Sequence, residues 1–310
     1  MGSPDFAVPC LEAVVAAGHD VALVVTQPDK PAGRGGALTA PAVKHAALRL
    51  GLPVIQPRSA RAPEVAVTLA ATGAELAVVV AYGKLLPPAV LTAFPRGCIN
   101  VHGSLLPAYR GAAPIQWAVL DGRATTGVTI MQLDEGMDTG PMLLTREVAI
   151  GPAETAGELF ARLAPLGAAT LVEALAALEA GTLVATAQPA AGASHARMLT
   201  KDDGVIDFAR PCATVAAHVR GVDPWPGAVA TLGGQVTKLA GARAVPGAID
   251  ARPGTVVAID ADGAHVACAD GVVVVRELQL PGRKRMTARD LANGRRLAIG
   301  DVLAPPPAAP

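Results

Sequence analysis

The chain has 310 residues, 51% of them hydrophobic, which is enough apolar surface for the cores of two ordinary domains. Its formal net charge is zero, which excludes attraction of a polyanion by the charge of the whole molecule and leaves that task to local basic patches. The four cysteines lie far apart with no histidine at metal-ligand spacing, which favours buried free thiols over a metal site.

The first part of the chain alternates predicted helices and strands. Helices are expected over residues 9–17, 41–50, 63–71 and 88–93, and strands over residues 21–25, 53–55 and 76–80. A polar loop, residues 26–36, lies among them and contains too much Gly and Pro for regular structure. This alternation predicts an α/β domain with a doubly wound, mostly parallel sheet.

The start of the chain departs from this order. The turn from Gly2 to Phe6 opens a helix, and such a turn normally follows a strand. In a doubly wound sheet the first strand is central. We therefore expect the natural product to carry an apolar first strand before Met1, and the chain as given to be poorly soluble or inactive.

The central stretch from Cys98 to Gln116 concentrates the polar candidates. A short apolar strand ends in it, and Asn100 and His102 are two residues apart, so both side chains leave the same face of that strand. Open α/β sheets usually bind ligands at this end of their strands. If the site transfers an acyl group to an amine, the amide N–H of Asn100 and an imidazole N–H of His102 are suited to stabilise the oxyanion.

A third candidate, Asp138, lies in an acidic turn over residues 134–140, and it is suited to set the tautomer of His102 and to relay protons. No Ser stands in a Gly-x-Ser-x-Gly turn and no Cys is paired with a base by pattern, which favours direct transfer over a covalent intermediate. Spacing alone leaves another interpretation open, because a single Asn, His or Asp in such a place is more often structural.

Strands predicted over residues 127–133 and 141–150 flank the acidic turn. They are followed by a long helix over residues 154–180, with Thr155 and Glu158 as a capping box and a break near Pro165. Even its Ala-rich part carries Glu173 and Glu179, and no secretory segment is visible at the N-terminus. We therefore expect a cytoplasmic protein that does not enter a membrane.

The pattern changes after residue 181, where periodicity is lost and a linker is expected. Beyond it, short strands recur with turns between them, which predicts a small antiparallel β-barrel, similar to an OB-fold. These strands are expected over residues 229–232, 236–239, 254–259, 264–267 and 272–278. The expected domains are residues 1–181 for catalysis, 182–200 for the linker, 201–303 for the barrel and 304–310 for a mobile tail.

Several motifs together resemble the 10-formyltetrahydrofolate-dependent formyltransferases. They are Asn100-x-His102, Gly103-Ser-Leu-Leu-Pro107, Tyr109-Arg-Gly-Ala-Ala-Pro-Ile115, Gly127-Val-Thr-Ile-Met131 and Asp134-x-Gly-x-Asp-Thr-Gly140. The resemblance extends from Gly2 to about Arg296. Within the family, the loop from Gln27 to Gly35 and the motif Asp223-Pro-Trp-Pro226 are typical of the branch that acts on tRNA.

The resemblance implies a Rossmann-like catalytic domain that transfers a formyl group from 10-formyltetrahydrofolate to the α-amino group of methionyl initiator tRNA. It implies that Asn100, His102 and Asp138 carry catalysis and that no metal takes part. The folate is expected to lie against two segments, which comprise Ser104, Leu105, Leu106 and Pro107, and Ala81, Tyr82 and Gly83. The Leu106–Pro107 peptide is expected to be cis.

Contacts with tRNA are expected from Arg34 in the Gly-rich loop and from the basic run Arg283, Lys284 and Arg285. Either feature can also be an ordinary solvated surface. Two other functions stay open: a formyltransferase that acts on a nucleotide-linked amino sugar, which we expect to lack both features, and a catalytically inactive RNA-binding relative. We expect the protein to be a monomer.

Overall fold

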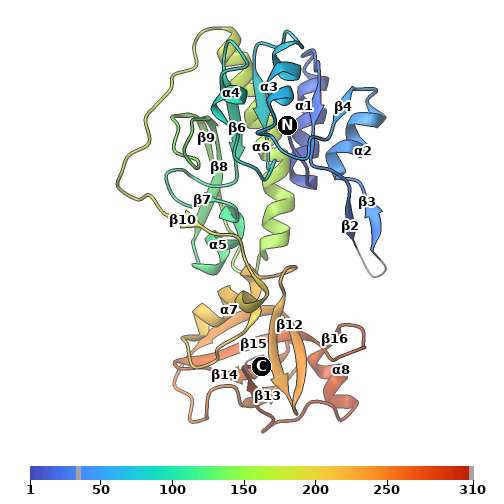
Figure 1. Ribbon diagram of the computed structural model, residues 1–310. Helices are drawn as coiled ribbons and strands as arrows, with labels where there is room; N and C mark the ends of the chain where they lie inside the picture. Colours follow the sequence, from blue (N-terminus) through green and yellow to red (C-terminus); the bar gives the residue numbers. More distant parts are fainter. Residues whose placement is uncertain (33–35, 307–310) are drawn as a thin grey trace. The chain divides into compact units, whose positions relative to one another are not determined.

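The computed structural model describes residues 1–32 and 36–306, which form two compact units (Figure 1). Unit 1 contains residues 1–114, 127–148 and 160–196, and unit 2 contains residues 115–126, 149–159 and the chain from Arg197 onward. Unit 1 therefore extends to Ala196, well into the segment expected to be a linker.

The strands of unit 1 form the expected sheet in two parts. β1 (Val24–Val25) pairs in parallel with β4 (Val54–Ile55), and β5 (Ala77–Val79) pairs in parallel with β6 (Cys98–His102). β8 (Thr125–Gln132) lies antiparallel beside β6, and β9 (Met142–Ala149) follows at the edge. All five residues of β6 are buried, as are Ala77 and Val79 of β5, whereas Val78 is partly buried.

The first two residues lie between the two parts of this sheet. The N–H of Gly2 donates to the carbonyl of Val25 (3.0 Å), and the N–H of Val80 donates to the carbonyl of Met1 (2.8 Å). Burial lowers the pKa of the Met1 amine to about 6. Beside these residues is an apolar pocket lined by residues that include Leu11, Val14, Leu23, Leu76 and Val78.

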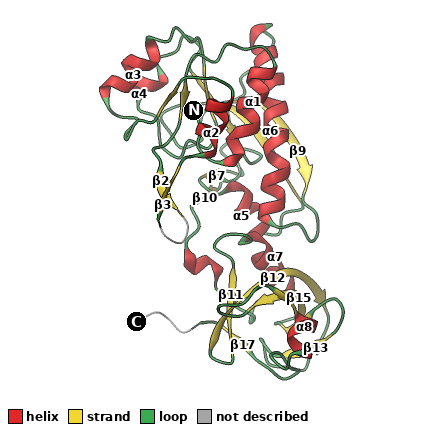
Figure 2. Ribbon diagram, turned by 90° about the vertical axis from the view of Figure 1, so that its right-hand side faces the viewer, coloured by secondary structure: helices red, strands yellow, loops and turns green. Residues whose placement is uncertain are grey.

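The helices of unit 1 begin and end close to their predicted bounds. They are α1 (Val8–Ala16), α2 (Ala42–Arg49), α3 (Pro63–Ala70), α4 (Pro88–Leu91) and α6 (Ala156–Glu179). A short 3-10 helix, η1 (Asp5–Ala7), precedes α1. Both ribbon views show α1 and α6 side by side (Figure 2), and the rings of Phe6 and Phe160 are 5.1 Å apart there.

Helix α6 corrects one prediction and confirms another. It continues through Pro165, where the sequence predicts a break, because buried leucines on both sides of the proline hold the helix against its unit. The capping box is present, since the N–H of Thr155 donates to Glu158 (2.9 Å) and the N–H of Glu158 donates to Thr155 (3.2 Å).

Length and composition make α6 a candidate membrane span, alone among the helices of the described chain. Half of its most apolar stretch is buried inside the protein, however, and buried core helices of soluble proteins can have the same length and composition. The helix is therefore weak evidence for a membrane segment.

The Gly- and Pro-rich loop is more regular than predicted. β2 (Lys30–Ala32) and β3 (Ala37–Thr39) form an antiparallel hairpin in which Pro31 is opposite Leu38. A two-stranded hairpin tolerates this proline because alternate N–H groups face away from the partner strand. At its base, Gln56 and Lys44 donate to Asp29, and these hydrogen bonds lower the pKa of that carboxyl group.

Unit 2 is an antiparallel sheet that curls until its two ends meet. Its strand order is β13 (Val256–Ile259), β14 (Ala264–Ala267), β15 (Gly271–Gln279), β12 (Gln235–Pro246), β11 (Ala228–Leu232) and β17 (Leu303–Ala304), with β16 (Met286–Thr287) beside β15. A bridge between Thr255 and Val302 connects the two ends. This arrangement confirms the small antiparallel β-domain.

Three helices of unit 2 are absent from the predicted elements. They are η2 (Lys201–Gly204), α7 (Cys212–Gly221) and α8 (Ala288–Asn293). Val215 and Val219 of α7 are buried in the core of the sheet, which explains why this helix forms although its sequence has only a weak periodic signal. The expected mobile tail needs a correction at Ala304, which pairs with Thr231; residues 307–310 lie outside the described chain.

Candidate active site

The end of β6 places two polar side chains in an otherwise apolar strand. Asn100 is 8% exposed and His102 is 5% exposed, and both leave the same face of the strand, as their spacing predicts. Asn100 is opposite Val79 of β5 on one side and Met131 of β8 on the other. Among the residues that the structure describes, none forms a hydrogen bond with the carboxamide of Asn100, so this group is available to a ligand.

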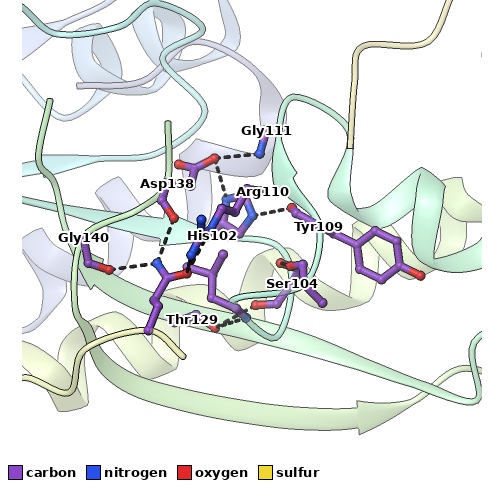
Figure 3. A network of polar contacts seen from close by, with 11 residues as sticks. His102, Ser104, Tyr109, Arg110, Gly111, Thr129, Asp138 and Gly140 are labelled. Carbon is purple, nitrogen blue, oxygen red and sulfur yellow. Dashed lines mark hydrogen bonds and ion pairs between the residues drawn. The ribbon is translucent and has the colours of Figure 1, made fainter. Parts of the chain in front are cut away.

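His102 lies between a carbonyl group and a carboxylate (Figure 3). Its Nε2 is 2.9 Å from the carbonyl oxygen of Tyr109, and its Nδ1 is 3.7 Å from Oδ2 of Asp138. Because a carbonyl oxygen can only accept, the Nε2 atom carries the hydrogen of that bond. The imidazole is thereby oriented with its second nitrogen facing Asp138.

Asp138 is held by its backbone as well as by its carboxylate. The residue has a φ of 55°, a left-handed conformation that is uncommon for any residue but glycine. Its Oδ2 accepts a hydrogen bond from the N–H of Gly111 (2.8 Å; Figure 3). Within the same turn, Asp134 accepts from the N–H of Gly136 (3.0 Å) and from the hydroxyl of Thr139 (2.8 Å), which fixes the acidic loop.

A second layer of contacts, which the sequence analysis missed, surrounds this turn. Gln188 donates to the carbonyl groups of Asp138 (2.7 Å) and Gly140 (2.8 Å), and it accepts from Arg110. β7 (Arg110–Gly111) pairs in parallel with β10 (His195–Ala196), so the presumed linker is part of the site. Gln188 is 50 residues from Asp138 and 78 from Arg110 along the chain, and no local pattern signals such contacts.

The loop after β6 is fixed from inside the unit. Thr129 of β8 donates to the carbonyl of Ser104 (2.7 Å) and accepts from the N–H of Leu106 (3.2 Å), and the Ser104 hydroxyl donates to the Ala108 carbonyl (2.7 Å; Figure 3). Ser104 and Leu106 are buried, whereas Leu105 and Pro107 are partly exposed. The Leu106–Pro107 peptide is cis, which confirms that prediction.

The end of β5 is beside the end of β6 and contributes mainly backbone. Ala81 and Gly83 are exposed and have positive φ values of 46° and 78°. The side chain of Tyr82 is in the core of unit 1, and its carbonyl accepts from Gln27 (2.7 Å). An open pocket borders Ala81 and is also lined by Ser3, Asp5, Lys30 and Thr39.

The residues predicted to contact tRNA fall in two places. Arg34 lies outside the described residues, whereas Arg283 and Lys284 are exposed in the turn between β15 and β16. Arg285 is exposed as well, with its guanidinium 3.9 Å from Asp223 and 3.8 Å from Glu277. These two carboxylates reduce the positive charge that Arg285 offers to a phosphate.

The cysteines do not form a metal site. Cys10, Cys98, Cys212 and Cys268 are free and buried, which confirms the prediction for the thiols. Burial raises the pKa of Cys10 to about 12 and that of Cys98 to about 11. Across residues 1–32 and 36–306, no group of three His, Cys, Asp or Glu side chains is arranged to hold a metal ion.

Comparison with known proteins assigns both units to one family. The formyl transferase model matches residues 1–175, and the model of the formyl transferase C-terminal domain matches residues 198–296. A methionyl-tRNA formyltransferase of Solibacter usitatus is 50% identical over 303 residues, which cover 98% of this chain and 97% of that protein. A methionyl-tRNA formyltransferase of Desulfotalea psychrophila is 47% identical over 303 residues, which cover 98% of this chain and 94% of that protein.

Solved structures support the fold. An N-formyltransferase from Helicobacter canadensis, in complex with folinic acid and dTDP-3-aminofucose, aligns with a TM-score of 0.66 over 90% of this chain and 97% of that chain, at 16% identity. HypX from Aquifex aeolicus, in complex with tetrahydrofolic acid, aligns with a TM-score of 0.56 over 79% of this chain and 43% of its own, at 19% identity. With both domain models matched in order and relatives at about half identity along nearly the full length, the chain belongs to the formyl transferase family.

Proposed function

We propose that this protein transfers the formyl group of 10-formyltetrahydrofolate to the α-amino group of methionyl initiator tRNA, as a cytoplasmic monomer. The observation that carries the proposal is the 50% identity to a methionyl-tRNA formyltransferase over 98% of the chain, which includes the second unit as well as the first. The model of the formyl transferase C-terminal domain also matches residues 198–296 of this second unit.

The ends of β5 and β6 fit a folate. The fused pterin ring of a folate needs apolar walls with a few convergent polar groups. Leu105 and Pro107 offer partly exposed apolar surface, and the backbone of Ala81 and Gly83 is accessible beside them. We assign the folate to this edge, with Ser104, Leu106 and Tyr82 holding the two segments in place from inside. The folate supplies the formyl carbon.

The reaction needs a neutral amine and two hydrogen-bond donors. The α-amino group attacks as the free base, and its ordinary pKa of about 7.7 to 8.0 leaves a useful neutral fraction at cell pH. The bond from the amine nitrogen to the formyl carbon forms, and the bond from that carbon to the folate nitrogen breaks. The proton that the amine loses reaches the folate nitrogen.

The three polar residues divide these tasks. Asn100 donates its free carboxamide N–H to the oxygen of the formyl group as negative charge develops there. His102 exchanges its bond to the Tyr109 carbonyl for one to the substrate and passes the proton. Asp138, 3.7 Å from the imidazole, orients the ring and stabilises its charged form.

A formylation assay with purified protein tests the proposal. The formyl donor is 10-formyltetrahydrofolate, and the acceptors are methionyl initiator tRNA, methionyl elongator tRNA and a dTDP-linked amino sugar. We expect formylated initiator tRNA and at most slow reaction with the other two. Formylation of the amino sugar in place of the tRNA would support the alternative acceptor, and no formylation of any acceptor would favour an inactive RNA-binding relative.

A further inference from the structure

Gln188 connects two parts of the active site through its side-chain carboxamide. The Nε2 group donates to the carbonyl oxygens of Asp138 (2.7 Å) and Gly140 (2.8 Å). The Oε1 atom accepts from Nε (3.0 Å) and Nη2 (2.8 Å) of Arg110. Both hydrogens and both acceptor positions of the amide are therefore used, and all partners are in unit 1.

These four bonds close a ring of contacts around the catalytic carboxylate. Arg110 is followed by Gly111, whose N–H donates to Oδ2 of Asp138 (2.8 Å). Gln188 thus contacts Asp138 directly, through the Asp138 carbonyl. It also contacts strand β7 through Arg110, and the next residue of β7, Gly111, donates to the Asp138 carboxylate. The φ of 55° at Asp138 is left-handed, a conformation that is uncommon for residues other than glycine and persists where surrounding contacts enforce it.

The segment that carries Gln188 also forms hydrogen bonds with the loop that contains Tyr109 and Arg110. Ser194 accepts from the N–H of Tyr109 through its hydroxyl (2.9 Å), and the N–H of Arg110 donates to its carbonyl (2.8 Å). β10 then pairs with β7. The stretch after α6 is therefore a strap over the loop that orients His102 and Asp138.

We propose that Gln188 is a positioning residue for catalysis, which acts by keeping the carboxylate of Asp138 in its place beside His102. This inference rests on the proposed function, because it concerns the same site and the same reaction. A Gln has two donors and two acceptor positions in one planar group, and this bridge uses both sides of it. The assignment also gives the strap a catalytic purpose beyond joining the two units.

The substitution Gln188→Glu separates the two halves of the bridge. A carboxylate still accepts from Arg110, but it has no hydrogen to donate and its second oxygen faces the carbonyl groups of Asp138 and Gly140. The hydrogen bonds from Arg110 are therefore kept, and the hydrogen bonds to the carbonyl groups of Asp138 and Gly140 are lost. We expect turnover to fall by about tenfold or more, with KM values for folate and tRNA within about threefold of wild type.

A double-mutant cycle with Asp138→Asn distinguishes positioning from a general structural role. If Gln188 acts through the Asp138 carboxylate, the double variant should be slower than Asp138→Asn by no more than about threefold, because the losses are not independent. Rates are measured with enzyme in excess, so that slow variants still give a value. Gln132→Glu is the matched control, since Gln132 donates to the carbonyl of Arg96, outside the site, and it should keep wild-type turnover.

The inference would be overturned if turnover of Gln188→Glu stayed within about threefold of wild type, or if the losses multiplied in the double variant. A loss of turnover that parallels a lower melting temperature in Gln188→Glu, with Gln132→Glu normal, would also count against it. These results are separate from failure of the proposed function, which would show as absent formylation of methionyl initiator tRNA by the wild-type protein.

Discussion

Single residues at the site are held in conformations and environments that folding alone does not favour. Four residues other than glycine have a positive φ in the part of the chain described, and three of them, Ala81, Tyr109 and Asp138, line or support the site. Such conformations cost on the order of 1–3 kcal/mol each and persist where the surroundings enforce them. Asn100, which is 8% exposed, adds a carboxamide without a hydrogen-bond partner among the described residues.

The free carboxamide of Asn100 is suited to donate to the substrate. We expect Asn100→Ala to lower turnover roughly a hundredfold or more, because one oxyanion donor contributes about 2.7 to 4 kcal/mol to catalysis. Folate affinity should change much less. Steady-state kinetics with a folate-binding measurement checks this, and a loss of tenfold or less would remove Asn100 from the donor role.

His102→Ala and Asp138→Asn should show the same separation, because both groups act where charge develops in the transition state. We expect each to reduce turnover far more than folate binding. The melting temperature of each variant serves as the control for folding. Equal losses in turnover and in folate affinity would indicate that these side chains bind the folate and take no part in the transfer.

Among the elements, β8 and β9 approach each other too closely for a side chain at one position. A Cβ atom on Gly127 would overlap the carbonyl of Arg146 in β9 and lie 2.6 Å from Leu105. Gly127→Ala should therefore destabilise unit 1 by about 1–3 kcal/mol, as overpacking typically does. Thermal unfolding measures the effect. Gly294→Ala is the control, because its Cβ would come no closer than 3.4 Å to another atom, and a similar loss there would refute the explanation.

The start of η2 makes the stability of unit 2 depend on pH. Hydrogen bonds from Arg197, and further ones from Thr200, hold the pKa of Asp203 well below its usual range. The folded state therefore keeps a carboxylate that the unfolded state protonates near pH ~4, so this stabilisation is present above that pH and is lost as the pH falls.

We expect the urea midpoint of wild type to exceed that of Asp203→Asn at neutral pH, and the difference to shrink below pH ~4. The two proteins are compared by urea unfolding at a series of pH values, with a probe in unit 2 such as the fluorescence of Trp117 and Trp225. A difference that stays constant down to pH ~3 would show that Asp203 stabilises the unit by something other than its charge.

Sequence patterns predict these elements unevenly. The helices of unit 1 and the strands β5, β8 and β9 follow clear periods and turn signals, so their predicted bounds are close to the observed ones. The hairpin β2–β3, helix α7 and strand β10 were missed. Helix α7 and strand β10 depend on partners from elsewhere in the chain, the β-sheet core for α7 and β7 for β10, and local propensity does not report such partners. The hairpin is a local pairing, and it was missed because Gly and Pro usually indicate irregular structure.

At the scale of the whole molecule, a net charge of zero makes any attraction of RNA a local matter. Arg283, Lys284 and Arg285 are exposed on one turn of unit 2, and Arg289, Arg295 and Arg296 are exposed in or after α8. Asp290, the acidic residue among them, is bonded to Thr287 at the start of α8.

Replacing Arg283, Lys284 and Arg285 by Ala should weaken tRNA binding and lower its dependence on salt by up to about three phosphate contacts. Most of this change should come from Arg283 and Lys284, because Arg285 already lies near two carboxylates. Folate affinity should stay the same. Binding titrations over a range of salt concentrations decide the matter, and an unchanged slope would leave the turn as a solvated surface.

The sequence by itself determined the two-domain organisation, the family motifs and the placement of Asn100 and His102 on one face of a strand, because all of these depend on spacing along the chain. Only the tertiary structure decided the rest: that Asp138 faces His102, that Ser104 and Tyr82 point inward, and that Gln188 ties the acidic turn to Arg110. Contacts between segments 50 or more residues apart arise from the packing of whole elements, and no local period encodes them.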